Sequence, residues 1–291
     1  SEIRAENNLI RTVQTSTKMT VGEYLEQDVH AKDQWFPVSP ILNKKTLTEG
    51  AGQVRAISRL ALDTAMKKGN IEPLHKAIEE LNQLTGEQAQ QALRVIVVSS
   101  LAGGTGSGLI LPVAMYIKHF LATRFKQSAN IMRGFFILPE VFYEVITGQP
   151  ERNNLRCNAY ATLRELDAFL MKGDGTLPEK YKDLKFEVPR IGSDEYDSYE
   201  ETPYDFCFLF DAQNKDGKKL TSFEQYKEHA ANCIYAQSIG PMNKRSNSSE
   251  DNVVRLLCKT GGRSRYCGAG SAMLVYPFKD IKEYLALQLA K

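Results

Sequence analysis

The residues best suited to chemistry lie in the stretch RVIVVSSLAGGTGSG at 94–108. After an apolar run and two serines, it ends in Gly103, Gly104, Thr105, Gly106, Ser107 and Gly108. Glycines let backbone N–H groups turn towards a ligand, and a helix that begins here would add the partial positive charge of its N-terminus. The stretch therefore predicts an anion site. A tight turn without a ligand is the alternative, but glycines interleaved with hydroxyl residues at a strand end are not typical of one.

Two common phosphate-binding loops do not fit this spacing. The P-loop requires Lys and then Ser or Thr after its final glycine, whereas Gly108 is followed by Leu109 and Ile110. The dinucleotide pattern GxGxxG, started at Gly104 or Gly106, lacks its last glycine. A different signature is needed to explain the loop.

Alternating strands and helices have to position the loop. The β-branched run at 93–100 predicts a central parallel strand, and apolar residues at helical spacing follow from Leu109. Pro112 fits that helix only in its first turn, so we expect the helix to begin just before Pro112. Further strands are predicted at 134–139, 204–211 and 271–277, and further helices at 53–67, 71–84, 153–170, 223–240, about 250–259 and 280–290.

This alternation predicts the fold class. Strands and helices that follow one another over this length form an α/β fold with a Rossmann-like, mostly parallel sheet and helices on both faces. Residues 1–49 show no clear pattern, and 192–203 is predicted to be a polar loop.

The composition excludes several classes of protein. Of the 291 residues, 42% are hydrophobic and 25% are charged, which suits a large globular domain. The net charge of +2 comes without a basic block typical of nucleic-acid binding. The longest apolar stretch, 109–117, is too short to span a bilayer. Five cysteines without CxxC spacing favour reduced core thiols over a zinc site, so we expect a cytoplasmic protein without a structural metal.

The loop AGGTGSG at 102–108 resembles the phosphate-binding signature of the tubulin/FtsZ superfamily, (G/A)-G-G-T-G-(S/T)-G, at every position. In that superfamily the loop leads from a strand into a helix and holds the phosphates of GTP. The resemblance implies GTP or GDP as the ligand, accompanied by Mg²⁺ where hydrolysis occurs. It implies that the phosphates are held by Ala102, Gly103, Gly104, Thr105, Gly106, Ser107 and Gly108.

Further segments extend the resemblance over roughly residues 48–260. Gly50, Ala51 and Gly52 resemble the turn that lies near the γ-phosphate, although a glycine-rich turn before a helix is an equally good interpretation of this segment alone. Glu140 and Glu144 stand where the superfamily has its ribose-contacting loop.

Three asparagines are the candidates for contacts with guanine. Asn158, with Asn154 second, matches the Asn that contacts the base, and helix capping is the rival role. The helix 223–240 stands in the place of the long central helix, where Asn232 is the polar candidate. Four residues before it lies Glu228, not the aromatic residue that the superfamily has there.

The acid needed for hydrolysis would follow the central helix. Glu250 and Asp251 are the candidates to complete the GTPase site of the next subunit in a head-to-tail filament, but the usual spacing is not reproduced. A favourable charge at a helix start is the alternative. The resemblance therefore implies a divergent, bacterial-type tubulin-like protein that is either a filament-forming GTPase or a non-catalytic scaffold. An enzyme that uses ATP or NAD on a similar sheet is the third hypothesis.

The resemblance also implies an organisation of the chain into parts. We expect a nucleotide-binding domain at 1–222, the central helix at 223–240, and the start of a C-terminal domain at 241–291. The first strand and first glycine loop of the superfamily have no match here, and we expect them upstream of Ser1.

Overall fold

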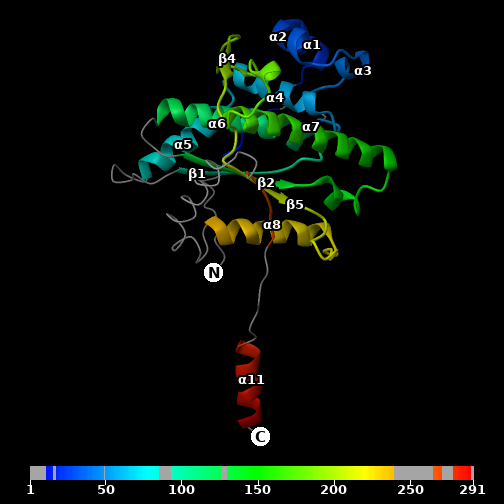
Figure 1. Cartoon of the computed structure of the whole chain (residues 1–291), viewed down its shortest axis with the longest axis vertical. Coiled ribbons are helices and arrows are strands. Elements are labelled where there is room, and N and C mark those ends of the chain that lie inside the picture. Colours follow the sequence, from blue (N-terminus) through cyan, green and yellow to red (C-terminus); the bar gives the residue numbers. More distant parts are fainter. Residues whose placement is uncertain are drawn as a thin grey trace.

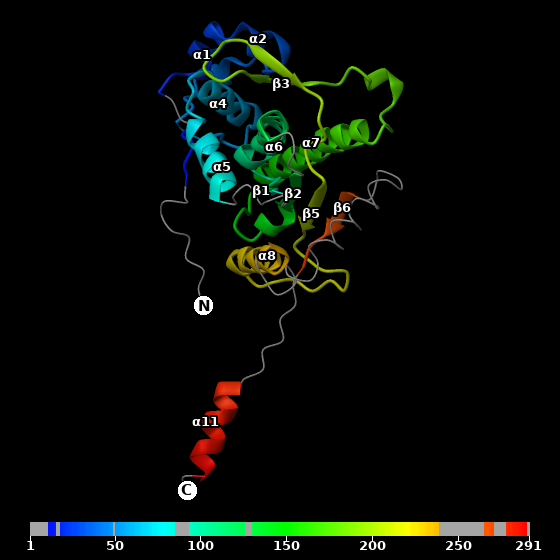
Figure 2. The ribbon, with the colours of Figure 1, turned by 90° about the vertical axis from the view of Figure 1, so that its left-hand side faces the viewer.

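The computed structural model describes residues 11–15, 18–48, 50–84, 93–125, 130–238, 265–270 and 278–289. In this part of the chain, parallel strands form a central sheet in the order β1-β2-β5-β6 (Figure 1; β6 is labelled in Figure 2). Ser100 pairs with Ile137, and Ile137 pairs with Phe210, so the carboxyl ends of β1, β2 and β5 are level. The loops that follow these strands therefore share one edge of the sheet. The strands are β1 Leu93–Ser100, β2 Asn130–Ile137, β5 Phe206–Phe210 and β6 Tyr266–Gly268.

Helices cover both faces of this sheet, which confirms the predicted α/β class. In Figures 1 and 2, α4, α5, α6 and α7 lie on one face and α8 lies on the other. The helices are α4 Arg55–Lys67, α5 Glu72–Leu84, α6 Gly104–Arg124, α7 Gln149–Gly173 and α8 Phe223–Ser238. Short 3-10 turns, η2 Pro139–Phe142 and η3 Glu179–Tyr181, follow β2 and α7.

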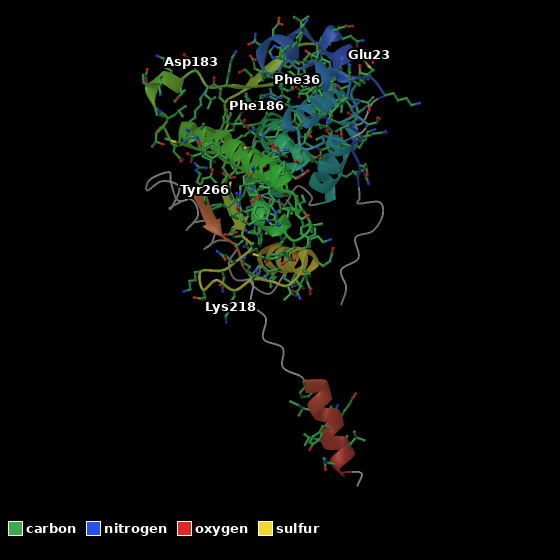
Figure 3. All side chains as sticks on the ribbon, turned by 90° about the vertical axis from the view of Figure 1, so that its right-hand side faces the viewer. Glu23, Phe36, Asp183, Phe186, Lys218 and Tyr266 are labelled. Carbon is green, nitrogen blue, oxygen red and sulfur yellow. The ribbon has the colours of Figure 1, made fainter. Side chains whose placement is uncertain are left out.

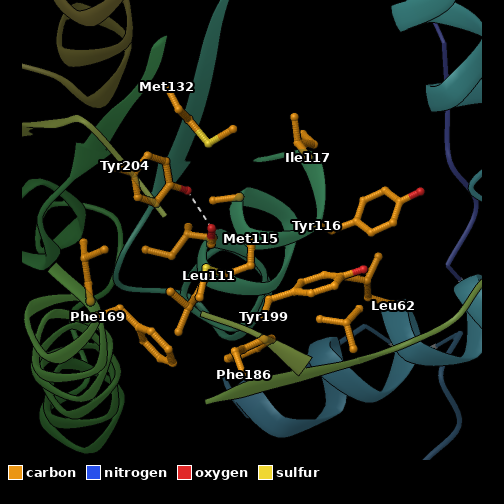
Figure 4. Packing of buried hydrophobic residues seen from close by; sticks show 14 of the residues in the cluster. Leu62, Leu111, Met115, Tyr116, Ile117, Met132, Phe169, Phe186, Tyr199 and Tyr204 are labelled. Atoms are coloured by element: carbon orange, nitrogen blue, oxygen red, sulfur yellow. Dashed lines mark hydrogen bonds between the residues drawn. The ribbon is translucent and has the colours of Figure 1, made fainter. Parts of the chain in front are cut away.

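The main core surrounds α6. This helix is apolar on nearly all sides, which suits a helix enclosed by α4, α7 and the sheet. Tyr204, just before β5, is fully buried against α6, and its hydroxyl donates to Ile110 O at 2.5 Å (Figure 4). Burial of large side chains such as Met115 and Phe136 therefore fixes α6, and with it the loop at its N-terminus.

A second layer packs on α4. The helices α1 Val21–Gln27, α2 Val29–Gln34 and α3 Pro40–Asn43 bury apolar side chains against Ile57 and Leu60. An antiparallel hairpin, β3 Phe186–Pro189 with β4 Tyr196–Tyr199, reaches the same layer, and Phe36 and Phe186 lie at one end of the molecule in Figure 3. The sequence predicted none of these elements.

Two predictions about elements are wrong. The helix α6 begins at Gly104, not just before Pro112, and Pro112 lies buried in its interior. The glycine loop itself supplies the first helical turn, and the surrounding core offsets the missing N–H of Pro112. The predicted loop 192–203 contains β4, whose four half-polar residues have no clear strand pattern.

Of the elements predicted in the C-terminal part of the chain, one is confirmed and two cannot be compared with the structure. The helix α11, Phe278–Leu289, matches the predicted helix 280–290. The predicted strand 271–277 and the predicted helix near 250–259 lie outside the described residues. The division into domains stays a prediction. Among the described helices, none combines the length and apolar character that crossing a membrane requires.

Candidate functional site

The loop after β1 presents the start of α6 to solvent. Gly103 is the N-cap residue, and Ser107 N–H makes the first helical hydrogen bond, to Gly103 O at 3.1 Å. The backbone N–H groups of 103–106 therefore come before the helical ladder, and no side chain of the described residues caps them. An anion placed here would receive hydrogen bonds from these groups and the favourable end of the helix dipole.

The glycines are needed because other backbones pack directly against the loop. A Cβ added to Gly106 would lie 2.2 Å from the Ser100 carbonyl oxygen, and one added to Gly104 would lie 2.7 Å from Val54 N. A Cβ on Gly103 would meet no atom within 4 Å. The loop is therefore tightly packed on one side and open at Gly103, which is the side from which a ligand can approach.

The Gly-Ala-Gly turn lies against this loop. Ala51 O accepts a hydrogen bond from Val54 N at 2.8 Å, and the two residues between them, Gly52 and Gln53, have φ of +50° and +64°. Positive φ at both central positions is typical of a type I′ turn. Gln53 is the non-glycine residue with positive φ in the described part of the chain, and such strained backbone clusters at functional sites. Sequence reasoning missed Gln53, because no residue pattern signals this conformation.

The helix α7 ties both loops together through one amide. Asn158 Nδ2 donates to Gln53 O at 2.9 Å and to Ala102 O at 3.1 Å, which leaves Oδ1 to accept from a ligand. Asn154, one turn earlier, donates to Gln53 Oε1 at 3.2 Å. Neither residue caps the helix, whose N-cap is Gly148, so the rival capping role is excluded. Contact with guanine stays a prediction for both asparagines.

Arg55 makes a second connection among the same three segments. Its Nη2 donates to Ser107 O at 3.3 Å, and its guanidinium forms a bidentate pair with Glu165 on α7. Thr162 Oγ1 lies 3.3 Å from Ser107 O, although its closer acceptor is Asn158 O of the same helix, at 2.7 Å. A Cβ on Gly108 would lie 2.4 Å from Arg55 O, so this glycine is needed for the approach of α4 to α6.

The two hydroxyl residues of the loop have different environments. Ser107 is buried, and its hydroxyl donates to Gly103 O within the first turn of α6. Thr105 is exposed at the open side of the loop. The structure thus leaves the Thr105 hydroxyl for a ligand and commits the Ser107 hydroxyl to the helix start.

The other predicted site residues are not brought into contact with the glycine loop. Glu140 lies in η2, directly after β2, and Glu144 follows it; both side chains are exposed. Asn232 is exposed on α8, across the sheet from α7 (Figure 2). Glu250 and Asp251 lie outside the described residues.

A cluster of buried charges lies further along α4. Asp63 is 1% exposed, and burial raises its pKa to about 7, although the guanidinium of Arg59 lies 3.9 Å away and opposes this shift. Burial also lowers the pKa of Arg59, which lies between the rings of Trp35 and Phe186, 4.1 and 4.6 Å from their centroids.

Asp28 has a better-satisfied environment in the same cluster. Burial opposes its charge, but hydrogen bonds from Ala31 N, Lys67 and Tyr196 lower its pKa below the ordinary value. Lys67 Nζ lies 3.0 Å and Tyr196 Oη lies 2.8 Å from Asp28 Oδ2. The cluster joins α2, α4 and β4. Among the described residues, no three His, Cys, Asp or Glu side chains gather as a metal site would require.

Fold and site together define a class: a parallel α/β protein whose glycine loop presents helix N–H groups at the carboxyl edge of the sheet. A family model described as tubulin like matches residues 5–291. The chain therefore belongs to the tubulin-like family. No curated protein matches the chain.

Proposed function

We propose that the protein binds guanine nucleotide, GTP or GDP, at the junction of β1 and α6. The observation that carries this proposal is the set of uncapped N–H groups of 103–106 beside an open Gly103. Their donors and the helix dipole suit the α- and β-phosphates, and the Thr105 hydroxyl adds one side-chain donor. Membership of the tubulin-like family supports guanine over other bases.

The neighbouring loops have complementary roles in this proposal. In this proposal the turn of Gly50, Ala51 and Gly52 lies beside the γ-phosphate, and its packing against Gly104 keeps it next to the glycine loop. Glu140 or Glu144 accepts hydrogen bonds from the ribose hydroxyls. Asn158 Oδ1, with Asn154 as the second candidate on the same helix, meets the edge of guanine. Mg²⁺, when present, would neutralise charge on the phosphates.

We further propose that self-association completes a GTPase. In a head-to-tail contact, Glu250 or Asp251 of one subunit would orient the attacking water at the nucleotide of the next. A heterologous contact that does not close produces filaments. A scaffold that retains the fold without turnover is the alternative.

Gly103→Asp tests the nucleotide site without damaging the fold. Gly103 has φ of −79° and open space, so Asp fits there, and its carboxylate can cap α6 itself. We expect unchanged or slightly higher thermal stability, with affinity for GTP and GDP reduced at least about 100-fold because the carboxylate occupies and repels the phosphate site. Calorimetric titration of the full chain measures both nucleotides, with ATP as the competitor.

Gly103→Asn is the matched control, since it keeps the size of the side chain and removes the charge. We expect a smaller loss of affinity than with Asp. Equal affinity of the parent chain for ATP and GTP, or unchanged binding by the Asp variant, would contradict the proposal.

Hydrolysis is tested separately with Glu250→Ala combined with Asp251→Ala. Phosphate release that rises more than linearly with protein concentration, and that the double variant loses while it still binds GTP, supports the GTPase. Turnover that is absent in the parent chain, or the same in the variant, supports the scaffold.

A further inference from the structure

Lys45 brings a full positive charge to the Gly-Ala-Gly turn. A Cβ added to Gly52 would lie 2.6 Å from Lys45 Nζ, so the ammonium group lies directly over the turn. Lys45 is half-buried and forms no ion pair with any carboxylate in the described part of the chain. A cation in this position has no structural counter-ion there, although the turn packs against the glycine loop.

The backbone holds Lys45 in place from both sides. Lys45 N donates to Leu42 O at 3.0 Å, at the end of α3, and Lys45 O accepts from Val21 N at 2.7 Å, at the start of α1. The next residue, Thr46, forms a bridge with Thr20. The side chain therefore extends from a fixed point of the helical layer on α4.

The cationic side chains near the Gly-Ala-Gly turn differ in whether other protein groups already bind them. Arg55 is held by Glu165 and by Ser107 O. Lys44 is exposed, and no side-chain contact ties it to the turn. The backbone donors of 103–106 offer partial charges only. Lys45 therefore supplies a full charge at the turn that, unlike that of Arg55, no carboxylate of the described residues pairs with, where the last phosphate of a nucleoside triphosphate would lie.

The geometry points to Lys45 as a ligand of the γ-phosphate that makes the site distinguish a nucleoside triphosphate from a diphosphate. This inference rests on the proposed nucleotide site. The ammonium acts as a point charge with rotatable donors, and a charge-assisted hydrogen bond to a phosphate oxygen is stronger than a neutral one. A diphosphate does not extend to the turn, so it gains little from Lys45.

The test measures two ligands on the full chain at constant Mg²⁺: GDP and a slowly hydrolysed GTP analogue. For Lys45→Met, which keeps most of the apolar stem, we expect about a tenfold loss of affinity for the triphosphate and less than about a twofold loss for GDP. Lys45→Arg keeps the charge and should retain most of the discrimination. Lys44→Met, its matched control, should change neither affinity.

The outcomes separate this inference from the proposed function. If the parent chain binds both nucleotides and Lys45→Met changes neither affinity, or lowers both equally, the role of Lys45 is wrong while the nucleotide site stands. If the parent chain binds neither nucleotide, the proposed function fails and this inference fails with it. If Lys45→Met unfolds at the same temperature as the parent chain, its change in affinity does not result from a loss of folded structure.

Discussion

The two ends of α4 lie in contrasting environments. Its first residues meet the glycine loop, where the glycines allow close backbone packing and backbone N–H groups stay available at the open end. Its later residues, Arg59, Asp63 and Lys67, meet a cluster in which full charges are buried and must satisfy one another. One region keeps polar groups unsatisfied for a ligand, and the other removes them from solvent.

This difference teaches how to recognise a binding site within the same molecule. Backbone N–H groups at a helix start lose little free energy when water is their hydrogen-bond partner, so they can remain free of protein partners and accessible to a ligand. Buried side-chain charges are costly without partners, and their arrangement serves to join α2, α4 and β4. Perturbed pKa values therefore mark the structural cluster here, whereas glycine contacts mark the proposed site.

Gly106→Val should have the largest effect on the glycine side of the comparison. The first side-chain carbon would lie 2.2 Å from the Ser100 carbonyl oxygen, so the backbone of β1 or α6 must move. We expect the free energy of unfolding to fall by more than about 4 kcal/mol, measured by urea denaturation. Gly103→Val, at the open position, should lose less than about 1 kcal/mol. Equal losses would show that flexibility of the loop, not close packing, requires the glycines.

Asp63→Asn should have the next largest effect, and it depends on pH. The folded-state pKa of Asp63, about 7, is above the ordinary value of 3.8, so the folded protein binds this proton more tightly than the unfolded chain. Stability contributed by protonated Asp63 is therefore lost as pH rises towards 7. Between pH 5 and 8 we expect the parent chain to lose about 3 kcal/mol relative to Asp63→Asn.

Unfolding of both proteins by urea at several pH values provides the measurement. The amide mimics the protonated acid, so the two should have similar stability below about pH 4, with the variant increasingly more stable from about pH 4 to 8. A variant that is less stable at pH 8 would show that Asp63 is ionised and paired with Arg59.

Of the three principal variants, after Gly106→Val and Asp63→Asn, Asn158→Ala should have the smallest effect on stability. It removes two hydrogen bonds, to Gln53 O and Ala102 O, and we expect a loss of about 1–2 kcal/mol in the free energy of unfolding. Asn154→Ala, which removes one exposed hydrogen bond, should lose less than about 0.5 kcal/mol. Nucleotide affinity should fall in Asn158→Ala because the two loops lose their common support. If Asn158→Ala and Asn154→Ala lose the same stability and the same nucleotide affinity, the hydrogen bonds of Asn158 do not hold the two loops together.

The parts of the fold that the sequence predicted are those with strong periodicity. The β-branched run became β1, and the apolar helical spacing became α6 and α11. The elements of 18–48 could not be predicted, because α1, α2 and α3 are four to seven residues long and depend on tertiary contacts with α4. The sequence does not show where α6 begins, because proline is ordinarily tolerated only in the first helical turn, whereas burial permits Pro112 inside the helix.

For the candidate site, the sequence predicts the glycine loop but not the residues that pack around it. The motif identified the loop, yet nothing in the sequence shows that Ser107 points inward while Thr105 points outward. Gln53 and Lys45 enter only through tertiary packing. Residue types thus located the loop, and the folded chain determines which atoms remain available.

One amide on α7 holds both glycine-containing loops, and this has a kinetic consequence. A shift of α7 along its axis would release Gln53 and Ala102 in the same step, so neither loop can open by itself without breaking the hydrogen bonds of Asn158. Separation of the two loops is therefore coupled to the motion of a helix of 25 residues and does not depend on loop flexibility alone.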